Sequence, residues 1–157
     1  MRLKTLIVTF IMITFFAAIC FDGSIHAQDI TKIRVVYKIP NMDKVQIQHG
    51  VKYMTFNGTD LTMDIYYPPN LKRDTRLPVV IFVLGYSDNV MQKKMGSKLK
   101  DIEQYISWGE LTAASGMIAI TYETQQPESD IDELLKYIRQ NAASLKINEN
   151  KIGIWSL

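Results

Sequence analysis

The sequence predicts an α/β fold in which a β hairpin precedes strands and helices that alternate as β-α-β-α-β. Three observations lead to this prediction. The dipeptide Asn57-Gly58 separates two aromatic and apolar runs, residues 79–84 are apolar without alternation, and residues 128–141 carry an apolar stripe at helical spacing. Strands and helices in this order indicate a parallel sheet joined by right-handed crossovers.

Composition limits the kind of protein that this chain can be. Its 157 residues suffice for one domain, and 47% of them are hydrophobic. A net charge of +2 argues against a nucleic-acid-binding protein, which would carry a clustered basic surplus. The single Cys excludes a disulfide framework and a Cys-rich zinc site, and two His residues leave few metal ligands. We therefore expect no metal site.

The first 27 residues have the layout of a secretory signal peptide. A short basic start precedes an apolar run over residues 6–21, and a small residue, Ala27, ends the segment. We expect cleavage after Ala27 and export to the periplasm or the cell exterior. The alternatives are an uncleaved membrane anchor and a lipoprotein cut before Cys20, which the bulky Ile19 disfavours.

Strands are expected first in the remaining chain. Residues 28–50 are interpreted as an N-terminal extension that includes a strand over the β-prone run of residues 33–39. Residues 51–56 and 61–67 then form the hairpin, because both residues of an Asn-Gly turn tolerate positive φ. His49 lies in a polar stretch just before the hairpin and is predicted to be a surface residue.

The alternating part of the chain follows the hairpin. Residues 78–84 predict a strand buried on both faces, and residues 117–122 predict the next strand. Residues 98–115 between them predict a helix, either in one piece or in two pieces divided at Trp108-Gly109. The lysines of residues 93–100 are expected to lie on a solvated loop and helix face.

The last helix has the clearest pattern. Residues 128–141 predict a helix in which Ser129 caps the start and Asp132 is its capping-box partner. Asp130 is interpreted in the same way, as a helix-start residue and not as a catalytic acid. A polar turn and a final strand are expected after this helix, over residues 147–150 and 151–155.

Four segments of this part resemble the α/β-hydrolase family, in particular its exported esterase and dienelactone-hydrolase-like members. They are GTDLTMDIYYPPN, LPVVIFVLGYSDN, WGELTAASGMIAITYE and INENKIGIWSL, in the order that the family has them. The resemblance covers most of residues 51–157. It implies an α/β-hydrolase-type sheet of which this chain holds the N-terminal half, so residues 51–157 are interpreted as an incomplete, truncated α/β-hydrolase domain.

The resemblance also implies an oxyanion hole after the strand over residues 78–84. In the family, a backbone N–H just after this strand helps to hold the negative charge that develops on the carbonyl oxygen. Here the turn is Leu84-Gly85-Tyr86-Ser87-Asp88. The N–H of Tyr86 is the candidate donor, and that of Ser87 is the second choice. Leu84 stands where the family usually has His, a change that leaves a backbone donor in place.

The family's nucleophile elbow, G-x-S-x-G, follows the strand that residues 151–155 resemble. In that alignment Ser156 takes the first small position, Leu157 takes the variable one, and the nucleophile comes next. The alternative is that Ser156 is itself the nucleophile, but Ile154 then stands where the elbow needs Gly. The family's acid and base follow the elbow, so we expect the whole triad beyond Leu157.

These expectations describe the N-terminal fragment of an exported serine hydrolase. The complete enzyme would act on a small-molecule carboxylic ester by acyl transfer, without a cofactor. It would bind no nucleic acid, and it would meet a membrane only if residues 1–27 stay uncleaved. The first alternative is a non-catalytic α/β-hydrolase-like binding protein, which the departures at Leu84 and Ser156 favour. A complete flavodoxin-like protein ranks last, because no glycine-rich phosphate loop follows a strand.

Overall fold

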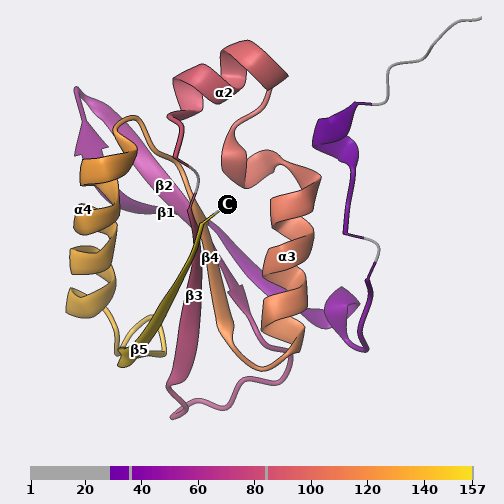
Figure 1. Cartoon of the computed structure of the whole chain (residues 1–157). Helices are drawn as coiled ribbons and strands as arrows, with labels where there is room; N and C mark the ends of the chain where they lie inside the picture. Colours follow the sequence, from indigo (N-terminus) through magenta and orange to yellow (C-terminus); the bar gives the residue numbers. More distant parts are fainter. Residues whose placement is uncertain (1–28, 36, 84, 157) are drawn as a thin grey trace, which may run out of the picture.

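The structure is a computed structural model that describes residues 29–35, 37–83 and 85–156. Its centre is a five-stranded mixed sheet with the strand order β1-β2-β4-β3-β5 (Figure 1). The strands are β1 (Gln46–Phe56), β2 (Thr59–Tyr67), β3 (Leu77–Val83), β4 (Ile118–Tyr122) and β5 (Ile147–Ser156). β2 is antiparallel to β1 and β4, whereas β3 is parallel to both β4 and β5. The predicted signal peptide lies outside the described residues.

Helices cover both faces of this sheet. The α-helices of the described residues are α2 (Asp88–Met95), α3 (Glu103–Ala114) and α4 (Pro127–Gln140), and the 3-10 helices are η1 (Ile30–Lys32), η2 (Met42–Lys44) and η3 (Leu99–Asp101). Figure 1 shows α4 on one face, α3 on the other, and α2 beyond the end of β3. The predicted order of a hairpin and then alternating strands and helices is confirmed, with α2 as an addition. Among the helices of the described ranges, none has the length and apolar character needed to span a bilayer.

The hairpin of β1 and β2 turns at Asn57-Gly58, as predicted. The φ angles are 46° for Asn57 and 78° for Gly58, and the residues on either side of the dipeptide pair directly. A two-residue turn with positive φ at both positions fits the twist of the strands that it joins. β1 begins at Gln46, earlier than predicted, and its register shifts near Gly50.

Residues 33–35 and 37–39 do not form the strand that their β-propensity predicts. This stretch runs along the outer side of α3 (Figure 1), where the N–H of Val35 donates to Ser107 Oγ at 3.0 Å. Arg34 forms ion pairs with two glutamates of the same helix. A strand needs a neighbouring strand to complete its backbone hydrogen bonds, and here the neighbour is a helix.

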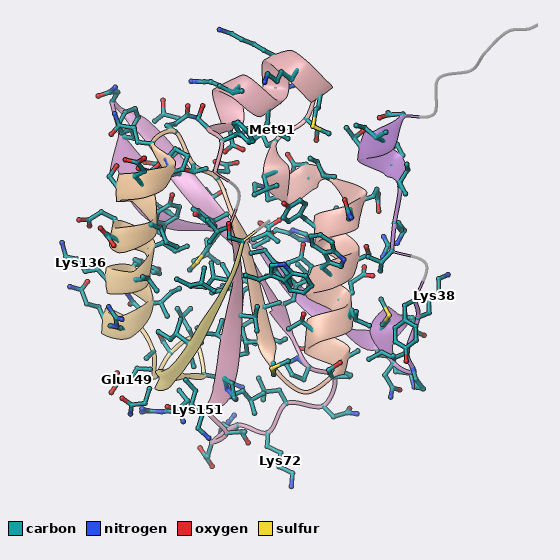
Figure 2. All side chains as sticks on the ribbon, in the orientation of Figure 1. Lys38, Lys72, Met91, Lys136, Glu149 and Lys151 are labelled. Carbon is teal, nitrogen blue, oxygen red and sulfur yellow. The ribbon has the colours of Figure 1, made fainter. Side chains whose placement is uncertain are left out.

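Two apolar cores hold the helices to the sheet. The core under α4 joins the apolar stripe of that helix to buried side chains of β2, β3 and β4, which confirms the predicted stripe. The core under α3 is more aromatic, with Tyr66, Phe82 and Tyr105 buried together. Figure 2 shows side chains filling both spaces, while the labelled Lys136 points away from the body of the protein.

Helix α3 begins at Glu103 because the backbone of Ile102 is extended and separates η3 from α3. Of the two alternatives for this helix, the division at Trp108-Gly109 is wrong, since α3 passes through both residues. Gly109 instead allows α3 to pack closely on β2, because a Cβ at this position would lie 2.9 Å from three ring atoms of Tyr66. Only a residue without a side chain lets the helix lie this close to the sheet.

Replacing Gly109 with Val should lower the free energy of unfolding by about 1–3 kcal/mol, because the new side chain must displace the buried ring of Tyr66. Chemical denaturation followed by circular dichroism measures this loss. Gln104→Val is the matched control, since it adds the same β-branched residue to an exposed position of α3. Helix propensity alone would favour Val over Gly at position 109. If Gly109→Val loses no more stability than Gln104→Val, the contact with Tyr66 does not restrict the side chain at this position.

Helix α2 takes the place of the expected solvated loop. Its residues are mostly polar, so hydrophobic periodicity does not reveal it. Its two ends do carry a sequence signal. Ser87 Oγ accepts the N–H of Val90 at 3.4 Å at the start, and Gly96, with a φ of 71°, ends the helix. Met91 then packs into the core under α3.

The capping box predicted at Ser129 is wrong. The helix begins at Pro127, and the side chain of the preceding Gln126 makes no cap hydrogen bond. The carboxylate of Asp130 accepts the N–H groups of Gln125 and Gln126 at 2.7 and 2.8 Å. Asp130 thus lies in the first turn of α4, as predicted, but its carboxylate accepts from the segment before the helix and does not cap the helix itself.

The polar turn predicted at residues 147–150 lies inside β5. Leu77 of β3 pairs with Ile147, and Val79 pairs with Ile152. The polar residues between Ile147 and Ile152 therefore form an irregularity within β5. They are not a separate turn before the strand.

Candidate active site

The parallel strands β3, β4 and β5 end at the same edge of the sheet, which we call the carboxyl edge. Val83 pairs with Ser156, so the turn after β3 and the end of β5 lie side by side (Figure 1). In open α/β sheets, ligands bind outside the carboxyl ends of the strands. The topology therefore brings together the two regions that contain the predicted site residues.

The turn after β3 presents backbone donors at this edge. Gly85 and Tyr86 are exposed, and none of the described residues accepts a hydrogen bond from the N–H of Tyr86 or Ser87. The Tyr86 side chain is also exposed, and Lys94 Nζ of α2 lies 5.5 Å from the centre of its ring. Leu84 lies outside the described residues. The two candidate N–H groups thus have no competing acceptor within the described chain.

A cavity of about 370 Å³ adjoins the turn. It is lined by Gly85 and by residues at and just before the start of α4, among them the polar residues Gln126, Glu128 and Ser129. This volume lies within the range of small-molecule sites in proteins, which begins at about 300 Å³.

Asp88 ties the turn to the rest of the carboxyl edge. Its carboxylate accepts the N–H of Thr124 at 2.7 Å and the N–H of Leu99 at 3.2 Å. Its own N–H donates to the carbonyl oxygen of Thr124 at 2.7 Å. Asp88 is only 2% exposed, and this burial raises the pKa of its carboxyl above the ordinary value, although the two backbone donors act in the opposite direction.

Ser156 ends β5 and is exposed. Its backbone is still part of the strand and pairs in register with Val83. An elbow serine, in contrast, lies on a strained turn after a strand. The geometry at Ser156 therefore differs from that of an elbow nucleophile.

His49 is a surface residue, as predicted, with its side chain 68% exposed. Its Nδ1 lies 2.9 Å from one carboxylate oxygen of the buried Asp64, and the other oxygen accepts the N–H of Gly50 at 2.8 Å. β1 and β5 are the two edge strands of the sheet, about 19 Å apart at about 4.8 Å per strand spacing. His49 therefore does not reach Ser156, and it stabilises the irregular part of β1 instead.

Sequence reasoning misses two features that organise the carboxyl edge. One is α2, whose capping residues Ser87 and Gly96 are the signal that could reveal it. The other is the contact of Asp88 with Thr124, for which the sequence holds no signal because the rest of α2, η3, α3 and β4 separate the two residues. Within the described ranges, no group of three or more His, Cys, Asp and Glu side chains is placed to hold a metal ion.

The sequence from residue 63 to residue 157 matches the family model BD-FAE, which describes an esterase family of the α/β-hydrolase type. The chain belongs to the BD-FAE family. The part that matches BD-FAE begins within β2 and includes β3, β4, β5 and the whole carboxyl edge. No curated protein matches the sequence.

Solved structures similar to this BD-FAE chain include the thermophilic esterase Est2 of the Planctomycetes species Thermogutta terrifontis. The propionate-bound form has a TM-score of 0.57 and 21% sequence identity, over 74% of this chain and 42% of that chain. The same esterase phosphorylated by paraoxon has a TM-score of 0.57 and 20% identity, over 80% of this chain and 46% of that chain. The BD-FAE chain thus spans less than half the length of esterase 2. At this identity the likeness shows the fold, and it confirms the predicted α/β-hydrolase-type sheet.

Proposed function

We propose that this protein is an exported serine esterase that transfers the acyl group of a carboxylic ester to a serine. One observation carries the proposal: β3 and β5 end side by side. The turn whose Tyr86 and Ser87 N–H groups have no acceptor among the described residues therefore adjoins the strand that leads to the nucleophile position. Membership of the BD-FAE family supports the reaction class. The basic and apolar layout of residues 1–27 supports export.

In the proposed reaction, the serine oxygen attacks the ester carbonyl, and a histidine accepts the serine proton and passes it to the leaving alcohol. A carboxylate orients the histidine. The N–H of Tyr86 holds the negative charge on the carbonyl oxygen, and the N–H of Ser87 is the second candidate. The nucleophile position follows Leu157, and the extended course of β5 through Ser156 supports this assignment over Ser156 itself.

Short acyl chains are the first substrates to test. Esterase 2 of Thermogutta terrifontis has been solved with propionate and with butyrate bound. The cavity beside Gly85, at about 370 Å³, is also of a size for small acyl or alcohol groups.

Protein expressed from its complete coding sequence tests the proposal. We expect saturable hydrolysis of 4-nitrophenyl acetate and 4-nitrophenyl butyrate. A fluorophosphonate probe should label a single serine, which peptide mass spectrometry should place immediately after Leu157. The coding sequence past codon 157 should in turn contain that serine and, further on, Asp and His. A protein that neither hydrolyses the esters nor reacts with the probe would be a non-catalytic binding protein on the same fold.

A further inference from the structure

We propose that Asp88 is a positioning residue for the oxyanion turn, in that it holds the backbone of residues 85–87 in one conformation. The inference rests on the proposed esterase function. In the proposed reaction Asp88 makes no contact with the substrate. It acts through the backbone N–H groups of Tyr86 and Ser87.

The contacts of Asp88 join three segments that are distant in sequence. The residue directly follows the turn, and its carboxylate reaches the loop after β4 at Thr124 and the start of η3 at Leu99. The backbone N–H of Asp88 returns to the carbonyl oxygen of Thr124 at 2.7 Å. Asp88 and Thr124 therefore form a closed pair of hydrogen bonds that fixes the turn against the end of β4.

The anchor at Thr124 is itself held in place. Thr124 is fully buried, and its hydroxyl donates to Asp130 at 2.9 Å. Asp130 is 1% exposed and also accepts the N–H groups of Gln125 and Gln126. The turn after β3 is thus connected, through Asp88 and Thr124, to the rigid start of α4.

Helix capping does not explain these contacts. Asp88 is the first residue of α2, but the cap oxygen belongs to Ser87, which accepts the N–H of Val90. The carboxylate of Asp88 accepts instead from residues outside its own helix.

The turn needs such an anchor because little else restrains it. Gly85 and Tyr86 are exposed, and glycine has more backbone freedom than any other residue. Donors that stabilise a developing charge act only when they are held in place before the reaction. Displacing a catalytic group by about 1 Å can lower the rate up to about 100-fold. A more mobile turn should therefore lower kcat.

Asp88→Asn is the main test, because Asn keeps the shape of Asp but replaces one accepting oxygen with an NH₂ group that cannot accept. For 4-nitrophenyl butyrate we expect kcat to fall about tenfold while KM stays within about twofold. Hydrogen exchange should become faster at the N–H groups of Tyr86 and Ser87. Asp88→Ser, which is too short to reach Thr124 and Leu99, is the second variant if Asp88→Asn does not fold.

Asp64→Asn is the matched control. Asp64 is also buried and also accepts a backbone N–H, that of Gly50, but it lies on the hairpin and not at the turn. We expect it to lower the melting temperature like Asp88→Asn while kcat and the exchange at the turn stay as in the unsubstituted protein. If the unsubstituted protein hydrolyses esters and both variants behave alike in kcat and in exchange, the role of Asp88 is overturned and the esterase function stands. If the unsubstituted protein hydrolyses no ester, the esterase function fails and the positioning role fails with it.

Discussion

Removing the backbone N–H of Tyr86 should lower kcat for ester hydrolysis about 10²–10³-fold, the cost of losing one oxyanion donor. KM should change little, because the hydrogen bond strengthens only as charge develops on the carbonyl oxygen. The N–H can be removed without a change of side chain by incorporating the α-hydroxy acid analogue of tyrosine, which turns the amide bond into an ester bond. The kinetics with 4-nitrophenyl butyrate then report the loss of a single donor.

The same replacement at two other positions makes this experiment decisive. At Tyr37, which is exposed on the N-terminal segment, the analogue should leave kcat unchanged. At Ser87 the α-hydroxy acid analogue of serine tests the second candidate. A large loss at Ser87 and none at Tyr86 would transfer the role to Ser87, and no loss at either residue would remove the turn after β3 from the oxyanion hole.

Phe82→Ala should lower the free energy of unfolding by about 3–5 kcal/mol, because it empties the aromatic core under α3. Phe82 is 1% exposed and lies on β3 at the centre of this core. Its ring centre lies 5.9 Å from that of Trp108 on α3 and 5.5 Å from that of Trp155 on β5. The substitution therefore weakens the attachment of both the helix and the edge strand.

Denaturation in guanidinium chloride, followed by tryptophan fluorescence, measures this effect. Phe82→Leu is the control, since it keeps most of the apolar volume and should cost less than about 1.5 kcal/mol. If Ala and Leu at this position cost the same, the loss would come from the aromatic contacts with Trp108 and Trp155 and not from the cavity.

The sequence predicts those elements that depend on residues close together in the chain. The turn at Asn57-Gly58 follows from the tolerance of two adjacent residues for positive φ, and the structure shows it there. The apolar stripe of α4 follows from helical spacing within one segment, and it packs on the sheet. The sequence does not predict α2 by periodicity, because only its ends, Ser87 and Gly96, carry a signal.

The candidate site is predicted only in part. The family resemblance singles out Tyr86, Ser87 and the region of Ser156, but it does not say how these residues lie relative to one another. The pairing of Val83 with Ser156 supplies that relation, because it places the end of β5 beside the turn. The register of two parallel strands pairs residues that are far apart in the chain. A single sequence does not specify which residues pair in this way.

The sequence alone thus determined the hairpin, the buried strands and the class of fold, because these depend on residues close together in the chain. The tertiary structure decided what depends on contacts between distant residues. Residues 33–39 have the propensity of a strand, yet the described part of this run lies against a helix. Gly109 resembles a helix breaker in the sequence, but it is the point where α3 touches Tyr66. Asp88 can anchor the turn only because β4 brings the N–H of Thr124 beside its carboxylate. A buried carboxylate needs hydrogen-bond donors, and here the tertiary structure supplies them.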